Sequence, residues 1–202
     1  PQDTSSAASD VYKRQTLLRP EIVSIQPGES YELDVVIANR RVGHDFTQGT
    51  ADSNQVWLEV ILSIDGEPIL ISGQLNDQGE VDPQAYFLNT LQIDRNGQRI
   101  DRRNAEDIAA TLYNHQIPPG SADVVRYQFT MPAYQPEAVV QLDVAVKYRK
   151  FDAHYLRLIK NNPQESNELP IVTISKDRVV LSRTAHPQST EDPVWRRLND
   201  LG

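Results

Sequence analysis

The chain has 202 residues and carries 28 acidic and 20 basic side chains, which gives a formal net charge of −8. This length is enough to bury a core without cross-links. The absence of cysteine excludes disulfides, thiolate metal sites, a cysteine nucleophile and covalently attached c-type haem within these residues. The acidic excess and the scattered basic residues argue against a nucleic-acid partner. No apolar run is long enough to insert into a membrane.

The first residues are small and polar without periodicity, so we expect a disordered or artefactual tail over 1–20. Residues 5–15 resemble a translated sequencing-adaptor sequence from an assembled metagenomic read, and a native disordered linker is the alternative. Because the chain starts at Pro1 and its single methionine is Met131, we expect a fragment or a processed form.

From Glu21 onward, apolar and polar residues alternate with a period of two, which predicts strands with one buried face. The four clearest strands are predicted at Tyr31–Ile37, Val56–Leu62, Val125–Phe129 and Val140–Tyr148. Shorter ones are predicted at 22–25, 68–72, 87–93, 171–174 and 179–181.

Turn signals separate these strands, among them Asp65-Gly66, Asn96-Gly97 and Pro118-Pro119-Gly120. Many short strands with turns between them indicate an all-β fold, an antiparallel β-sandwich, over 21–183.

Helical content is expected to be minor. One or two helical turns are predicted at 105–113 with Asn104 as N-cap, and a short helix at 151–160 with Phe151, Tyr155, Leu158 and Ile159 on one face. After a linker at 184–191, Asp192 and Pro193 indicate the start of a further helix at 192–202.

The four histidines are the main candidates for chemistry. None has the spacing of a closed metal site, and no Gly-x-Ser-x-Gly setting supports a hydrolase. His44 lies in a glycine-containing loop between two strong strands, and His115 lies just before the Pro118 turn. By themselves, both favour a structural role in a turn over a ligand role. His154 and His186 are expected to be solvated.

The segment 76–82 offers alternating oxygen ligands around Gly79, which is the general pattern of a calcium loop. It lacks the full EF-hand pattern, so a solvated turn is the favoured interpretation and calcium the alternative.

Several segments together resemble the non-haem β domain of multihaem c-type cytochromes of the cytochrome c-554-like, tetratricopeptide-containing type. They are Asn-Arg-Arg-Val-Gly-His-Asp-Phe at 39–46, then 49–52, 56–60, 72–73, 94–97, 99–104, Tyr-Asn-His-Gln-Ile-Pro-Pro-Gly at 113–120, 148–151, 169–170 and 195–202. The last of these resembles the first helix leading into tetratricopeptide repeats.

The resemblance implies that haem motifs of the CxxCH type lie upstream and that this β domain packs against the haem-bearing region. It implies His44 and His115 as candidate axial or second-shell haem ligands, because both stand at histidine positions of the family motifs. Two positions depart from the family pattern: Thr47 replaces a common proline, and Tyr86 stands where a histidine often follows Asp-Pro-x-Ala.

We therefore predict an accessory structural and binding domain of an extracytoplasmic, periplasmic multihaem cytochrome. This domain would shield the haem c of the parent chain and supply a distal histidine ligand. The parent chain would take part in electron transfer. If so, His44 should point outward between Phe46 and Trp57. The alternative is a standalone carbohydrate- or protein-binding sandwich whose contact patch uses Trp57 or Tyr86. The residues give no support for an independent hydrolase.

Overall fold

A computed structural model of the chain describes residues 25–47 and 53–181. The predicted tail at 1–20, the linker at 184–191 and the helix at 192–202 lie outside these residues, as does nearly all of the strand predicted at 22–25.

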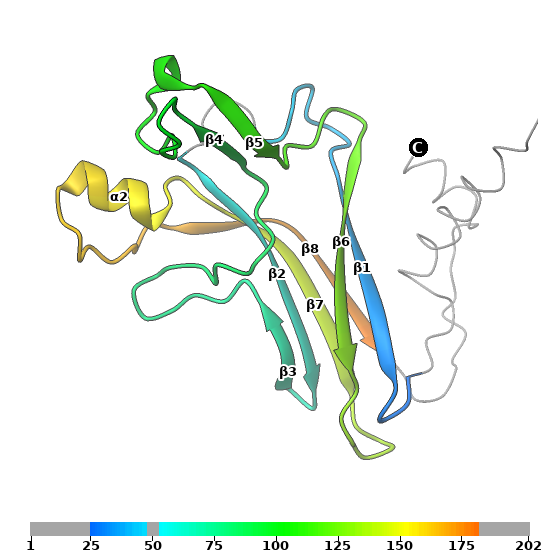
Figure 1. Ribbon diagram of the computed structural model, residues 1–202. Coiled ribbons are helices and arrows are strands. Elements are labelled where there is room, and N and C mark those ends of the chain that lie inside the picture. Colours follow the sequence, from blue (N-terminus) through cyan, green and yellow to red (C-terminus); the bar gives the residue numbers. More distant parts are fainter. Residues whose placement is uncertain (1–24, 48–52, 182–202) are drawn as a thin grey trace, which may run out of the picture.

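The larger layer is a four-stranded antiparallel sheet in the order β3-β2-β7-β8 (Figure 1). It contains β2 (Gln55–Ile64), β3 (Glu67–Ser72), β7 (Val140–Arg149) and β8 (Ile171–Leu181). The turn from β2 to β3 passes through Asp65 and Gly66 with φ values of 51° and 87°. Two successive positive φ values are the geometry that matches a tight hairpin to the twist of its strands.

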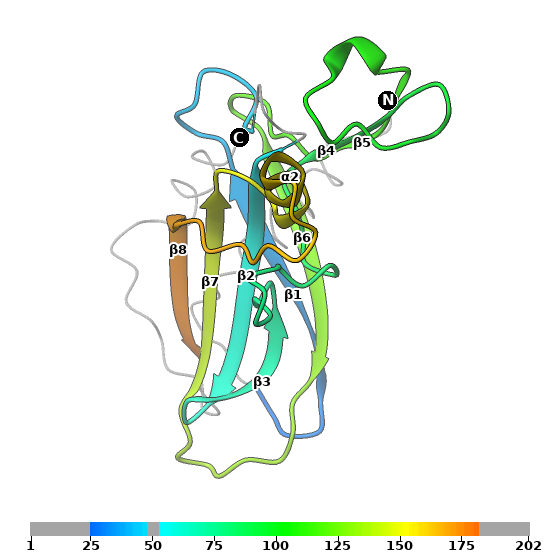
Figure 2. The same cartoon turned by 90° about the vertical axis from the view of Figure 1, so that its left-hand side faces the viewer.

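The second layer is a two-stranded ribbon of β1 (Ser30–Ala38) and β6 (Ala122–Thr130), paired antiparallel from Ser30↔Thr130 to Ala38↔Ala122. Figures 1 and 2 show that this ribbon lies on one face of the larger sheet. The predicted antiparallel sandwich is therefore confirmed.

The core fills the space between the two layers. Its buried residues are Ile25, Val35, Ile37, Val56, Leu58, Val60, Leu62, Leu88, Ile117, Met131, Val140, Leu142 and Val146. On β1, β2 and β7 these residues come mainly from alternate positions, as a strand with one buried face requires. The period-two pattern of the sequence thus predicted the inward faces of β1, β2 and β7.

A small hairpin of β4 (Thr90–Ile93) and β5 (Ala110–Asn114) stands out from both layers (Figure 2). Of the one or two helical turns predicted at 105–113, only the 3₁₀ turn η1 (Ala105–Asp107) forms, and Asn104 makes no N-cap hydrogen bond. Residues 110–114 are drawn into β5 because their main chain pairs with β4.

The predicted helix at 151–160 forms as α2 (Ala153–Lys160), with Oδ1 of Asp152 accepting a 2.7 Å hydrogen bond from the Tyr155 amide. The face that packs against the fold is a different one from the predicted apolar face. Ala153 and Leu156 are buried, whereas Leu158 and Ile159 are 42% and 51% exposed.

The two short strands predicted near the end form one long edge strand, β8. It pairs with β7 from Leu181 to Ile171, with a bulge beside Val146. Polar residues at 176–178 separate the two apolar runs but do not interrupt the strand. Almost every residue of β8 is exposed, so polar side chains are tolerated on both faces of this edge strand.

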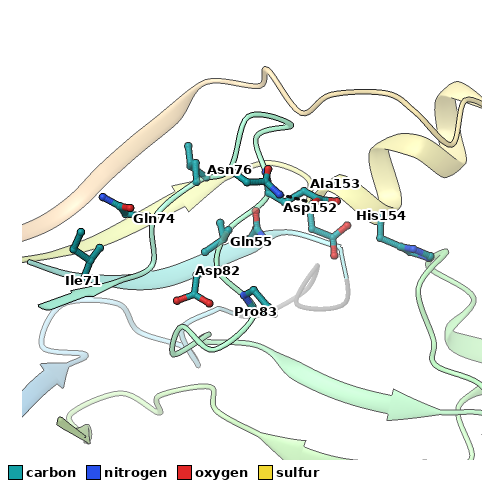
Figure 3. A pocket seen from close by; sticks show the side chains of 12 residues that line it. Gln55, Ile71, Gln74, Asn76, Asp82, Pro83, Asp152, Ala153 and His154 are labelled. Carbon is teal, nitrogen blue, oxygen red and sulfur yellow. Dashed lines mark hydrogen bonds between the residues drawn. The ribbon is translucent and has the colours of Figure 1, made fainter. Parts of the chain in front are cut away.

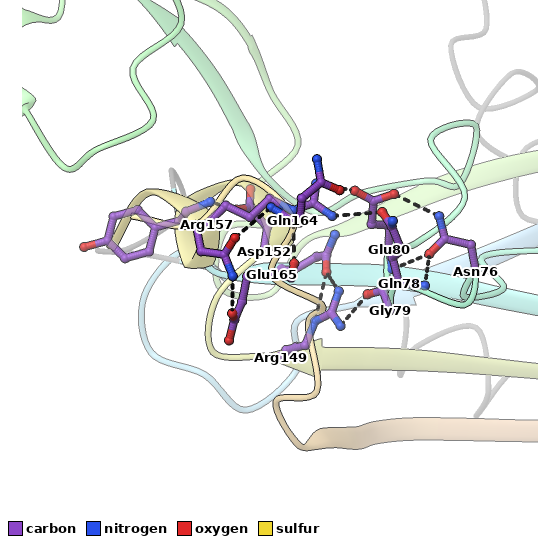
Figure 4. Close-up of polar contacts among 12 residues, drawn as sticks. Asn76, Gln78, Gly79, Glu80, Arg149, Asp152, Arg157, Gln164 and Glu165 are labelled. Atoms are coloured by element: carbon purple, nitrogen blue, oxygen red, sulfur yellow. Dashed lines mark hydrogen bonds and ion pairs between the residues drawn. The ribbon is translucent and has the colours of Figure 1, made fainter. Parts of the chain in front are cut away.

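A buried arginine ties the end of β7 to two loops (Figure 4). Arg149 is fully buried and donates hydrogen bonds to Gln55 Oε1, to the carbonyl of Gly79 at 2.7 Å and to the carbonyl of Asn167 at 3.2 Å. Its guanidinium lies 5.8 Å from the ring centroid of Trp57. Gly79 has a φ of +72°, and a Cβ there would lie 2.3 Å from the Asn167 carbonyl oxygen, so only glycine fits.

Candidate functional site

The two histidines at family-like positions are brought to one region of the fold by a main-chain bridge. Phe46 and Ile117 exchange hydrogen bonds of 2.9 and 2.6 Å, and each histidine lies two residues before its bridge partner. Asn39, at the end of β1, donates from its side chain to the carbonyls of both His44 and Ile117 at 2.9 Å. The segments carrying His44 and His115 are therefore fixed to each other, although they are far apart in sequence.

His115 is half-buried and stacked between two tyrosines. Its ring centroid lies 5.0 Å from that of Tyr86 and 4.6 Å from that of Tyr113, with interplanar angles of 16° and 27°. Its Nδ1 lies 3.1 Å from the carbonyl oxygen of Phe87. Because a carbonyl can only accept, Nδ1 carries the proton, and Nε2 of the neutral ring keeps its lone pair.

Tyr86 is itself anchored to the second layer. Its hydroxyl donates a hydrogen bond to Asp123 on β6. Burial, together with this hydrogen bond to a carboxylate, raises the pKa of Tyr86 above its usual range. The phenol therefore stays protonated and acts as a donor.

His44 is exposed, and its Nδ1 lies 2.8 Å from the carbonyl oxygen of the next residue, Asp45. The expected outward position is found. The expected pair of flanking aromatics is wrong, since Phe46 packs against the core and Trp57 is only 1% exposed.

Both imidazoles present the same chemistry. In each, Nδ1 is bonded to a main-chain carbonyl, and within residues 25–47 and 53–181 neither Nε2 has a hydrogen-bond partner. A carbonyl on Nδ1 is the arrangement that fixes the tautomer in which Nε2 binds a metal. A neutral imidazole held in this way has the donor chemistry of a haem ligand. Covalent attachment is excluded, because the chain has no cysteine.

The other histidines are arranged differently. His154 is exposed and its Nε2 lies 2.7 Å from Oδ2 of Asp101, so its ligand nitrogen is occupied. His186 lies outside the described residues.

The segment 76–82 forms a turn that uses its own oxygens. Oδ1 of Asn76 accepts from the amides of Gln78 and Glu80 at 3.0 and 2.9 Å, and Glu80 forms an ion pair with Arg157 (Figure 4). Hydrogen bonds from Asn76 and Arg157 lower the pKa of Glu80. In the part of the chain that the structure describes, no three His, Asp or Glu side chains are grouped to hold a metal ion. These contacts favour the interpretation as a turn over a calcium loop.

A pocket of about 590 Å³ lies between this segment and the start of α2 (Figure 3). Its polar lining includes Gln74, Asn76, Asp82 and Asp152. Burial raises the pKa of Asp152, whose carboxylate caps α2. The described lining contains no Ser, Thr or Lys.

The contact patch expected for a standalone binding module is not formed. Trp57 is buried against Val81 and Ala85, and its Nε1 donates to the carbonyl of Gly73 at 3.0 Å. Tyr86 is half-buried between His115 and Asp123. That part of the alternative is therefore wrong.

The sequence predicts His44 and His115 as site residues but gives no indication of the residues that contact them. Tyr113 on β5 and the Phe87 carbonyl before β4 contact His115, and Asp123 on β6 holds the hydroxyl of Tyr86. Tyr86, which the sequence analysis singled out, proves to stack on the His115 ring.

No helix among the described residues has the length and apolar character needed to cross a bilayer.

Comparison with known proteins identifies the fold alone. No protein-family model matches the chain, and no curated protein does. Among solved structures, the chain is similar to a penta-haem cytochrome c552 from Thermochromatium tepidum, with a TM-score of 0.54 and 16% sequence identity. The similarity covers 83% of this chain but only 41% of the cytochrome. This chain therefore has an all-β fold that also occurs as part of a multihaem cytochrome.

Proposed function

We propose that this chain is the non-haem β-sandwich region of an extracytoplasmic multihaem electron-transfer protein. In this proposal it packs against the haem-bearing region of the same protein, shields haem edges from water, and supplies a distal imidazole from His44 or His115. The fold shared with part of a penta-haem cytochrome supports the context.

The observation that carries the proposal is that the two imidazoles have the same hydrogen-bonding arrangement. Both rings have Nδ1 on a main-chain carbonyl and an Nε2 without a protein partner among the described residues. A neutral imidazole is a strong axial ligand for haem iron, and burial together with axial ligation sets the reduction potential. The haem itself would supply the electron-transfer chemistry. The residues of this chain would bind it, orient it and exclude water.

A haem peptide tests the proposal directly. Such a peptide carries haem c with one axial histidine and one open position, so a second imidazole converts its ferric iron from high spin to low spin. We expect this conversion when the chain is added, and we expect the double substitution His44→Ala with His115→Ala to abolish it. His154→Ala and His186→Ala are matched controls that should bind like the unaltered chain.

If the unaltered chain gives no low-spin spectrum at concentrations up to about 1 mM, where even weak contacts are populated, the ligand role is wrong. The natural gene provides a separate check. CxxCH motifs are expected upstream of Glu21, and their absence from a complete reading frame would favour the standalone binding module.

A further inference from the structure

Of the two candidate imidazoles, His115 alone is held by residues distant in sequence. Tyr86 covers one face of its ring and Tyr113 the other, and the Phe87 carbonyl accepts from Nδ1 across 28 residues of sequence. Its main-chain amide also donates to the carbonyl of Asn89 at 2.9 Å. Ring position, ring plane and tautomer are all set by the fold.

The segment that carries Tyr86 is itself rigidly placed. The Leu58 amide donates to the Tyr86 carbonyl at 2.9 Å, and the Leu88 amide donates to the Val56 carbonyl at 3.0 Å, so the segment is paired with the main chain of β2. The Tyr86 hydroxyl reaches across to Asp123 on β6. Tyr86 is thus fixed at both its backbone and its hydroxyl, so its ring restricts the position of the His115 imidazole.

His44 lacks this support. Its ring is exposed, and its Nδ1 contact is to the carbonyl of the adjacent residue, which moves with it. Binding a ligand would therefore have to order the His44 side chain, which costs affinity, whereas the His115 ring is already ordered.

We propose that His115 is the preorganised imidazole of this chain and that Tyr86, anchored by Asp123, is the positioning residue that fixes its ring plane. The inference rests on the proposed function for the identity of the ligand.

Substitutions of Tyr86 test the inference through the haem peptide. Ordering one side chain changes affinity by about two- to tenfold, so Tyr86→Ala should weaken binding about tenfold. Tyr86→Phe keeps the ring but loses the Asp123 hydrogen bond, and it should weaken binding only about threefold. Tyr134→Phe, which also removes one hydroxyl hydrogen bond, to the Ile25 carbonyl, is the matched control and should bind normally.

A spectroscopic readout separates positioning from general stability. The electron paramagnetic resonance signal of a low-spin ferric haem depends on the angle between its two imidazole planes. We expect one narrow set of g values with the unaltered chain, a broadened set with Tyr86→Ala, and a return to the narrow set with Tyr86→Phe.

The tautomer of His115 can also be read without haem, from its ¹⁵N chemical shifts. The proton should reside on Nδ1 in the unaltered chain and exchange between both nitrogens in Tyr86→Ala. If the haem peptide does not bind at all, the proposed function fails, while the nitrogen shifts still decide the positioning role. If the peptide binds but Tyr86→Ala leaves affinity, g values and tautomer unchanged, or if His44→Ala alone abolishes binding, the inference is overturned.

Discussion

The region around Arg149 and the region around His115 both bring together polar groups from segments far apart in sequence. They differ in how many of the central side chain's hydrogen-bonding groups are bonded to protein. At Arg149, the guanidinium donates to Gln55, Gly79 and Asn167 and its face covers Trp57. At His115, two aromatic rings and a carbonyl fix the imidazole, yet its Nε2 has no partner among the described residues.

The difference distinguishes a structural polar cluster from one suited to binding. Burial lowers the pKa of Arg149, and its neutral acceptors satisfy its donors without a directly bonded carboxylate. A buried cation of this kind joins strand and loops, and four of its five N–H donors are bonded to protein acceptors. The imidazole is equally well placed but retains one acceptor. Substitutions in the first region should therefore change stability, and substitutions in the second should change binding.

Replacement of Arg149 should have the largest effect on stability. Arg149→Met keeps much of the apolar stem but leaves the part-buried carbonyl of Gly79 and the buried carbonyl of Asn167 without their donor. We expect the free energy of unfolding to fall by about 4 kcal/mol. Arg149→Lys should also destabilise, because one ammonium cannot reproduce the planar fork. Urea denaturation measures both, and a loss under about 1 kcal/mol would show that the cluster is not structural.

The Arg149 region also fixes the conformation of Gly79, which can be tested against a matched glycine. Gly79 and Gly97 have similar φ values of +72° and +78°, but only Gly79 has a backbone atom where a Cβ would lie. Gly97→Ala should cost about 1 kcal/mol for the left-handed backbone alone. Gly79→Ala should cost about 3 kcal/mol, because the main chain at Asn167 must also move. If urea denaturation shows that both variants lose the same free energy of unfolding, the contact with Asn167 does not add to the cost of Gly79→Ala.

The elements predicted correctly from sequence are those with one buried face. In β1, β2, β6 and β7, alternate residues pack into the core, so the fold leaves a period of two in the sequence. In β5, every residue is exposed, so no alternation marks it as a strand. β8 is an edge strand with little burial, and its pattern was therefore read as two pieces.

The candidate site could be predicted only where a local motif carried it. His44 and His115 stand in short segments with glycine or proline turns, so they could be identified from sequence. Asp123 is one of several exposed-face acids in the sequence, and its contact with Tyr86 depends on how β6 lies relative to the segment before β4. Such a contact between distant segments leaves no local signal.

The smallest effect is expected where the connection between β4 and β5 meets α2. Asp101 accepts hydrogen bonds from Arg102 Nε at 3.1 Å and from His154 Nε2 at 2.7 Å. Burial opposes the charge on Asp101, but the hydrogen bonds from Arg102 and His154 outweigh it and lower the pKa of the carboxyl. Because the folded-state pKa lies below the unfolded value of about 3.9, this carboxylate stabilises the fold above that pH, and the contribution is lost as the pH falls through the lowered value.

Asp101→Asn should therefore cost about 0.5 kcal/mol at pH 7 and less at pH 3, while haem-peptide binding stays unchanged. If the His154 contact contributes, the double variant Asp101→Asn with His154→Ala should lose no more than Asp101→Asn alone. Strictly additive losses would show that the two side chains act independently.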